Sequence, residues 1–361
     1  KRIKRSKDVF IVMESYLSLA DYAAVFVLPL RRRKKMIKAI LFRGNDYLPV
    51  IKEEWCRNFL SSALPAFLTY RFFTRLGGCG YVCKSIITWY ENQVIDRAMI
   101  HAVRETMPGT RVIGAQLYIS PPNYLNLHLS ESEADANMAP HLLLHTCDHQ
   151  CRKVALFAQS SIPCKVAAAL RYQHLYEDTW RRHVDSRDED RIAALLLPAD
   201  LDESWELLEI AGEARGLMDP SLKLVVKGHP DYPRKKIENL LNRIKGGETF
   251  ETFTGALTDL LERSVAVISA NSSSMVEAAA RGLPIVYCGR QTTLNQNLLA
   301  GIDTHTVREA YTAEELAAAV NHYLDFSLTA GWNRSNEGLA IRDIFFTPVN
   351  DETMKPFIEG R

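Results

Sequence analysis

A histidine follows an apolar run in LVVKGHPDYP, residues 224–233. Pro230 has no backbone N–H and biases the residue before it toward an extended path, so the strand that the run predicts ends here. Ligands of parallel sheets bind beyond the carboxyl ends of the strands, so we expect His229 to face a crevice, where Lys227 adds positive charge. The alternatives are a histidine bonded within its own loop and a solvated lysine.

Three serines begin the second candidate stretch, in VISANSSSMVEAAARG at 267–282. Ser272, Ser273 and Ser274 stand where a predicted strand passes into a helix. The free N–H groups and the dipole of a helix N-terminus attract phosphate, and serine hydroxyls add donors without bulk. The alternative is a purely structural capping box formed by Ser274 and Glu277.

Taken together, the two stretches resemble the paired HP and SS signature of bacterial sialyltransferases, polysialyltransferases and related capsule Kdo transferases. The wider pattern KGHP…SSS…E…G.P is similar to glycerophosphate polymerases of the teichoic-acid type, and the resemblance covers residues 190–330 best. It implies the two-domain GT-B fold. It also implies that His229, Pro230 and the serines at 272–274 contact the nucleotide phosphate of a CMP- or CDP-linked donor.

An inverting sugar transfer needs a group that takes the proton from the acceptor hydroxyl. Glu91, in TWYENQVIDRA, ends a predicted strand and precedes a helix, which directs it toward the same crevice. Asn92 can cap that helix, which leaves Glu91 without an evident capping role. We therefore predict Glu91 as the base; a carboxylate that only sits near the helix dipole is the alternative. The acidic-acidic-glycine motif usual in sialyltransferases is absent, since DED at 188–190 precedes arginine.

Three further polar residues are candidate substrate contacts. Gln116 ends the strand after that of Glu91 and is placed to face the acceptor or the sugar. Arg171 and His174, in ALRYQHL, are candidates for a donor carboxylate, because arginine binds carboxylates through two parallel hydrogen bonds. Ordinary contacts between domains are the alternative for this pair.

Strands alternate with helices in two blocks that position these residues. Strands are predicted at 84–90, 111–116, 141–146, 192–198, 222–227, 265–270 and 284–289, and helices near 94–103, from 148, and at 202–216, 234–244, 255–263, 275–281 and 313–324. Such alternation implies parallel sheets with helices on both faces. We predict an α/β protein of two Rossmann-like domains facing across a cleft, 1–185 for the acceptor and 186–350 for the nucleotide sugar, divided within the charged stretch at 181–191.

Composition excludes several classes of protein. The 361 residues carry a formal net charge of +1, so no global field attracts nucleic acid. The basic runs at 1–7 and 31–35 are interpreted as solvated faces or as contacts with an anionic membrane. The apolar stretch at 59–73 contains a proline and an arginine, which fits a buried or interfacial helix better than a membrane span.

Cysteine usage favours a reducing compartment. Seven cysteines without a signal peptide predict free thiols in the cytosol, and the closing IEGR resembles a protease-site remnant. The histidines and cysteines of HLLLHTCDHQC, at 141–151, match no common zinc spacing, and Cys79 and Cys83 lack a partner pair. We expect no metal and no cofactor, because His229 and the helix N-terminus supply positive potential.

The resulting hypothesis is a metal-independent, inverting glycosyltransferase in the bacterial cytoplasm, peripheral at the inner face of the inner membrane. It would move an acidic sugar, Kdo or another nonulosonate, from a CMP donor to a surface glycan or glycolipid acceptor. Glu91 would act as base, and His229 would stabilise the leaving nucleotide. The alternatives are a transferase that uses a CDP-alditol or a UDP-sugar, an epimerase on the same fold, and a non-catalytic nucleotide- or glycan-binding protein.

Overall fold

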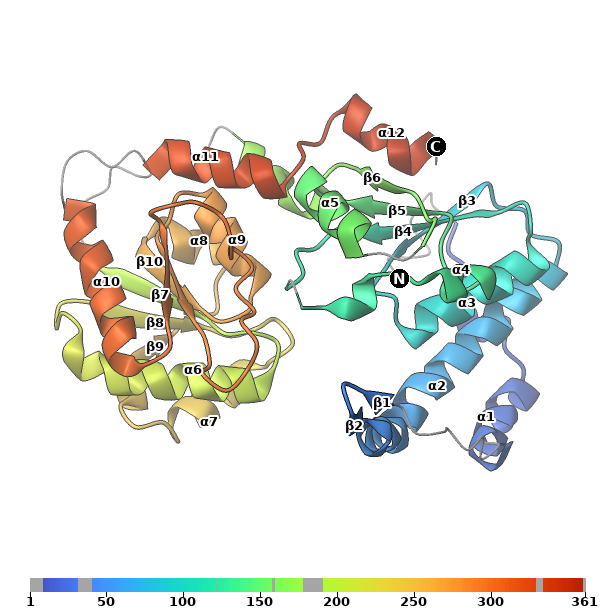
Figure 1. Cartoon of the computed structure of the whole chain (residues 1–361), viewed down its shortest axis with the longest axis horizontal. Helices are drawn as coiled ribbons and strands as arrows, with labels where there is room; N and C mark the ends of the chain where they lie inside the picture. The colour runs from blue at the N-terminus through green and yellow to red at the C-terminus, as the bar shows by residue number, and fades with distance from the viewer. Residues whose placement is uncertain are drawn as a thin grey trace.

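The computed structural model describes residues 9–31, 41–121, 123–157, 160–177, 191–328 and 334–359. Figure 1 shows two lobes, each built around its own sheet, with the last two helices running back from the second lobe to the first. The predicted domain boundary between residues 185 and 186 lies outside the described residues, as do DED at 188–190 and most of the two basic runs.

The N-terminal lobe begins with helices that the sequence did not predict individually. They are α1 (Leu19–Arg31) and the long α2 (Leu48–Gly78), with a hairpin of β1 (Leu41–Phe42) and β2 (Asn45–Asp46) between them. The apolar stretch at 59–73 lies within α2, which continues through Pro65. Over the described parts of the chain, no helix combines the length and apolar character needed to cross a membrane.

A four-stranded parallel sheet forms the centre of this lobe. Its strands are, in spatial order, β3 (Ser85–Trp89), β4 (Arg111–Gln116), β5 (Leu142–His145) and β6 (Cys164–Val166). The connecting helices are α3 (Val94–Thr106), α4 (Glu131–Asp135) and α5 (Asp148–Phe157). The three predicted strands are confirmed. β6 was missed because it has only three residues, none of them fully buried.

The C-terminal lobe holds a six-stranded parallel sheet. Its spatial order is β12 (Val307–Ala310), β11 (Ile285–Cys288), β10 (Ser264–Ser269), β7 (Ile192–Leu196), β8 (Lys223–Lys227) and β9 (Phe250–Thr252). Its helices are α6 (Leu201–Ala214), α7 (Arg234–Leu241), α8 (Leu257–Glu262), α9 (Ser273–Ala280) and α10 (Ala313–Leu328). The four predicted strands and five predicted helices are confirmed, whereas the short β9 and β12 were not predicted.

Side chains alternate between two apolar layers on this sheet. On one face, Leu195 and Val226 pack with residues of α6, α7 and α10, and on the other Val267 and Ile285 pack with α8 and α9. Burial on both faces is expected for parallel strands, and it explains why the strands appear in the sequence as continuous apolar runs. The sheet therefore offers only its strand ends to a ligand.

The chain returns to the first lobe after α10. Ile341 and Phe345 of α11 (Arg334–Phe345) pack in the second layer of the C-terminal core, and Phe357 of α12 (Asp351–Glu359) packs against the N-terminal sheet. The remaining short helices are 3-10 turns: Met13–Ser15, Leu125–Leu127, η4 (Leu170–Tyr176), Arg215–Leu217 and Gly247–Thr249. Both crossings between the lobes, η4 and α11, thus pack on the face of the C-terminal sheet that carries α9.

Candidate functional site

His229 lies in a tight turn at the carboxyl end of β8. The strand ends at Lys227, and the N–H of Tyr232 donates to the carbonyl of His229 at 3.0 Å, which places Pro230 at the second position of a turn. Nδ1 of His229 lies 3.3 Å from the Asp231 carboxylate. A Cβ at Gly228 would lie 2.7 Å from Ile237, so glycine lets α7 pack tightly beneath this turn.

Lys227 points away from the helix that carries the serines. Its Nζ donates to the carbonyl of Gly255 at 2.6 Å and lies 5.5 Å from the centre of the Phe253 ring. Burial lowers the pKa of Lys227, and Asp259 opposes that shift. The ammonium contributes charge near the edge of the sheet, but one of its hydrogens is already used in the hydrogen bond to Gly255.

The serine stretch forms the N-terminus of α9. Ser272 is the N-cap, and its hydroxyl accepts from the N–H of Ser274 at 3.3 Å. The capping box suggested for Ser274 and Glu277 is therefore wrong: the cap lies two residues earlier, and Glu277 is buried. Ser272, Ser273 and Ser274 are all partly exposed, so the first turn of α9 can be reached by a ligand.

Glu277 joins α9 to the crossing helix η4. Its Oε1 lies 2.9 Å from His174 Nε2 and 3.3 Å from Nη2 of the buried Arg281. Arg171 is exposed, with its guanidinium 5.7 Å from the centre of the Tyr172 ring. These contacts favour the interdomain alternative for His174 and Arg171, because η4 connects the lobes.

The loop after β7 lies between the His229 turn and α9, because β7 separates β8 from β10 in the sheet. The Tyr232 hydroxyl donates to the carbonyl of Ala199, and the Asn271 amide donates to Glu203 at 3.5 Å. Burial raises the pKa of Glu203, while the charge of Arg290 counteracts the rise. Sequence reasoning missed Glu203 and Arg290, since each belongs to a different strand-to-helix junction and neither forms part of a motif.

Glu91 stands at the carboxyl end of β3 with both carboxylate oxygens bonded to neutral donors. Trp89 Nε1 donates to Oε1 at 2.8 Å and Gln93 Nε2 donates to Oε2 at 2.6 Å. The N-cap of α3 is Gln93, which forms a capping box with Asp96; the prediction that Asn92 caps this helix is wrong. Glu91 is indeed not part of the cap.

Asn92 instead fixes the loop that carries Glu91. It has a left-handed φ of 54° and is buried, and its amide donates to the carbonyl of Asn126 at 2.8 Å. The Tyr90 hydroxyl donates to its oxygen at 2.9 Å. An asparagine tolerates this backbone conformation better than most residues, so the bonds hold the Glu91 backbone in one position.

Tyr124 brings the two strand-end regions into electrostatic contact. Burial is the largest cause that raises the pKa of Tyr124, and the negative charges of Glu203 and Glu91 raise it further. A hydrogen bond with Asn271 lowers this pKa. Glu91 belongs to the N-terminal sheet edge, and Glu203 and Asn271 belong to the C-terminal one. The pKa of Tyr124 therefore depends on groups from both sheet edges.

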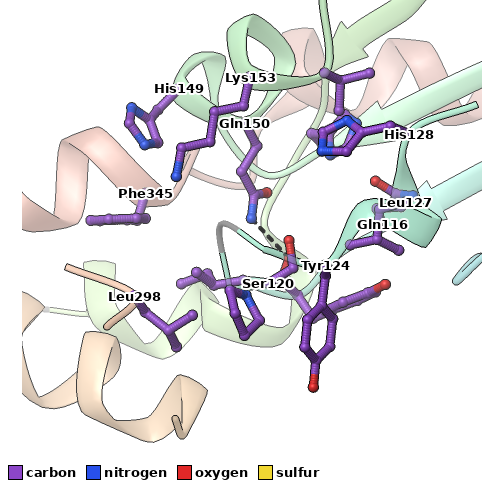
Figure 2. Close-up of a pocket in the computed structure, with 15 residues that line it drawn as sticks. Gln116, Ser120, Tyr124, Leu127, His128, His149, Gln150, Lys153, Leu298 and Phe345 are labelled. Atoms are coloured by element: carbon purple, nitrogen blue, oxygen red, sulfur yellow. Dashed lines mark hydrogen bonds between the residues drawn. The ribbon is translucent and has the colours of Figure 1, made fainter. Parts of the chain in front are cut away.

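A cavity of about 250 Å³ opens at the carboxyl edge of the N-terminal sheet. Figure 2 shows that Lys153, His149 and Gln150 enter it from α5, opposite the loop that carries Ser120 and Tyr124. Leu298 and Phe345 line it from the C-terminal lobe and from α11. Its polar lining also includes Gln116, Tyr118, His128 and His145. Of the predicted site residues, only Gln116 lines this cavity, and His229 and the serines do not.

Cysteines and histidines form no metal site in the part of the chain that the structure describes. No group of three or more His, Cys, Asp or Glu side chains is arranged to hold an ion there. His141 Nδ1 accepts from the N–H of Val112 at 2.9 Å. None of the seven cysteines forms a disulfide, and the Cys164 thiol donates to Sγ of Cys151 at 2.9 Å. Metal independence stays a prediction.

No protein-family model and no curated protein matches the chain. Among solved structures, MnaA of S. aureus with UDP is similar at a TM-score of 0.52 and 11% identity, over 81% of each chain. Anabaena HepE in complex with UDP-glucose is similar at a TM-score of 0.51 and 12% identity, over 77% of this chain and 78% of HepE. A candidate UDP-N-acetylglucosamine 2-epimerase of Listeria monocytogenes is similar at a TM-score of 0.53 and 14% identity, over 82% of this chain and 80% of the epimerase chain.

These likenesses and the two parallel sheets confirm the GT-B fold that the sequence predicted. They carry no sign of the sialyltransferase or Kdo transferase families, so that finer assignment stays a prediction. At such low identity the likeness concerns architecture alone. The chain therefore has the GT-B fold, with two parallel sheets in separate lobes.

Proposed function

We propose that this protein is a glycosyltransferase that uses a nucleoside diphosphate sugar, with uridine as the base of the donor. The observation that carries the proposal is that each sheet presents a polar group at its carboxyl edge: Glu91, with a fixed carboxylate, after β3, and the N-terminus of α9 after β10. One side offers a proton acceptor and the other an anion-binding helix end. A transfer between a nucleotide donor and a hydroxyl acceptor needs both.

The donor phosphates would lie on the first turn of α9. The N–H of Ser273 and the helix dipole favour negative charge there, and the Ser273 and Ser274 hydroxyls add donors, whereas the N–H groups of Ser274 and Met275 already donate to Ser272. His229, at the end of β8 and two strands away from β10, would donate from its ring to the leaving phosphate. Because Asp231 lies 3.3 Å from Nδ1, the outward Nε2 is the atom left to face the ligand.

Glu91 would accept the proton of the acceptor hydroxyl. Among the described residues it pairs with no cation, and its two bonds come from the neutral donors Trp89 and Gln93. The side chains of Trp89 and Gln93 hold the carboxylate in one orientation. This geometry suits a positioned general base better than a mobile surface carboxylate.

The choice of uridine over cytidine rests on the two similar architectures solved with UDP or UDP-glucose. The HP and SS resemblance instead favours a CMP-linked acidic sugar. An epimerase is the second candidate, because one similar structure is described as an epimerase. The cavity beside Gln116 favours a transferase, since an enzyme with a single sugar substrate has no need for a second sugar-sized site.

Titration calorimetry of the full chain with UDP, UMP, CDP and CMP tests the donor. We expect UDP to bind most tightly, and His229→Ala to weaken it by about tenfold, as expected for loss of one charge-assisted hydrogen bond. His322→Ala, on the outer face of α10, is the matched control and should leave binding unchanged. Selective binding of CMP would restore the acidic-sugar hypothesis, and absence of binding by all four nucleotides would overturn the transferase.

A further inference from the structure

The cavity at the N-terminal sheet edge contains positive charge and no carboxylate. Lys153 is half-buried, and within the described ranges it forms no ion pair. No Asp or Glu lines the cavity. The charge of Lys153 helps to lower the pKa of both His128 and His149, after burial, which places all three cationic or cationisable groups close together.

Two deeply buried residues of the cavity lining carry polar atoms that have no partner among the described residues. Gln116 and His145 are each 2% exposed, and Gln116 Nε2 and His145 Nε2 have no hydrogen-bond partner among the described residues. They are neighbours in the register of β4 and β5. Buried polar groups are nearly always hydrogen-bonded, because an unmade bond costs about 1–3 kcal/mol, so two such atoms lining one cavity indicate a ligand.

The size and position of the cavity fit a second substrate. Its volume of about 250 Å³ is near the lower end of small-molecule sites, which suits one sugar-sized group. Tyr118, another lining residue, stacks on Trp89 with 5.4 Å between ring centres, and Trp89 holds Glu91. The cavity therefore adjoins the candidate base.

We propose that this cavity binds an oxyanion carried by the acceptor, so that the acceptor is an anionic sugar bearing a phosphate or a carboxylate. Lys153 pairs with the anion, and the amide of Gln116 with the ring of His145 bonds the oxygens beside it. The proposal rests on the proposed transferase function and adds the chemical class of its second substrate. A neutral glycan would leave the Lys153 ammonium half-buried without a counter-charge.

Calorimetric titration of the full chain with glucose 6-phosphate, glucuronate and glucose tests this class. Both anionic sugars should bind at least tenfold more tightly than glucose, and the tighter of the two identifies phosphate or carboxylate as the group. Lys153→Met should weaken both by about tenfold or more, and Lys153→Arg should retain binding. Lys165→Met, at an exposed lysine of β6, is the matched control and should bind as the unmodified chain does.

Equal binding of glucose and the anionic sugars, or unchanged binding by Lys153→Met, would overturn the proposal. Gln116→Glu is a second variant, whose carboxylate should repel the anion and weaken binding of both anionic sugars by about tenfold or more. A UDP titration of each preparation distinguishes failure of the proposed transferase function from failure of the proposed anionic acceptor. UDP binding without preference for anionic sugars refutes only this inference, whereas anionic-sugar binding without nucleotide binding refutes the transferase and leaves the anion site standing.

Discussion

At the carboxyl edge of the C-terminal sheet the polar side chains bond to the protein itself, whereas at the N-terminal edge Gln116 and His145 keep polar atoms without partners. Ser272 caps its own helix, Lys227 donates to Gly255, and His229 faces Asp231. What remains for a ligand on that side is mainly the backbone N–H of Ser273, the dipole of α9 and Nε2 of His229. On the other side, side chains converge on an enclosed space.

The difference indicates two modes of recognition. A phosphate can be held by a helix N-terminus at an exposed edge, because the N–H groups are fixed by the helix and need no cavity. A sugar bearing a charge needs shaped walls and buried donors. We therefore expect the C-terminal edge to determine nucleotide affinity and the N-terminal edge to determine turnover and acceptor choice.

Glu91→Gln should produce the largest effect. Loss of a general base typically lowers kcat by about 10²–10⁴-fold, while nucleotide affinity should be unchanged because the base belongs to the other edge. Release of UDP from the preferred nucleotide sugar in the presence of acceptor, combined with UDP titration, measures both. Glu209→Gln, on the exposed face of α6, is the control. Turnover within threefold of the unmodified enzyme would remove Glu91 as the base.

Glu277→Ala should destabilise the C-terminal lobe by about 3 kcal/mol, because it leaves Arg281 buried without its counter-charge. The variant also removes the contact between Glu277 and His174, and so tests whether that contact fixes α9 relative to η4. Urea unfolding followed by circular dichroism measures the change. Glu53→Ala breaks the exposed pair with Arg57 and should cost less than about 0.5 kcal/mol. Equal losses for the two variants would contradict the assigned role of Glu277.

The buried histidine of the N-terminal lobe should make that lobe more sensitive to acid. Burial lowers the pKa of His145 to about 4, from about 6.5 in the unfolded chain. Between these values the unfolded chain binds a proton that the folded chain does not, so the free energy of unfolding falls as the pH falls from about 6.5 to 4, by at most ~3 kcal/mol from this residue.

Hydrogen exchange at pH 7.5 and pH 5 compares the two lobes directly. Strands β4 and β5 should lose protection at pH 5 before β7 and β10 do. His145→Gln removes one titrating ring and should reduce the difference between the lobes. Uniform loss of protection over both sheets would show that acid sensitivity does not follow from the buried ring.

How much of this could be predicted from the sequence depends on where the information lies along the chain. The alternation of strands and helices predicted the parallel sheets. The HP and SSS motifs marked two strand-to-helix junctions, because the residues of each motif are contiguous in the sequence. Glu91 was chosen as the candidate base because it directly follows a predicted strand, and its role stays a prediction. The cavity could not be predicted, since Gln116, His145 and Lys153 come from separate elements and only the sheet register and α5 bring them together.

Details of capping were predicted less well than the strands. Ser-x-x-Glu and Asn-Gln both match capping patterns, but the real caps are Ser272 and Gln93. Tertiary contacts accompany both cases: Glu277 contacts His174 of η4, and Asn92 is buried and donates to the carbonyl of Asn126. Local patterns cannot register such partners, because these lie elsewhere in the fold.

The smallest expected effect separates the structural and the binding roles of Ser272. Ser272→Ala should lower stability by about 1 kcal/mol, since it removes the N-cap, whereas Ser272→Asp keeps a good cap and should leave stability unchanged. The aspartate nevertheless places negative charge where the donor phosphate would lie, so UDP affinity should fall by about tenfold although the fold is intact. Thermal unfolding and UDP titration of both variants give the comparison. If Ser272→Asp binds UDP as the unmodified chain does, the N-terminus of α9 is not the phosphate site, and the serines serve only to begin the helix.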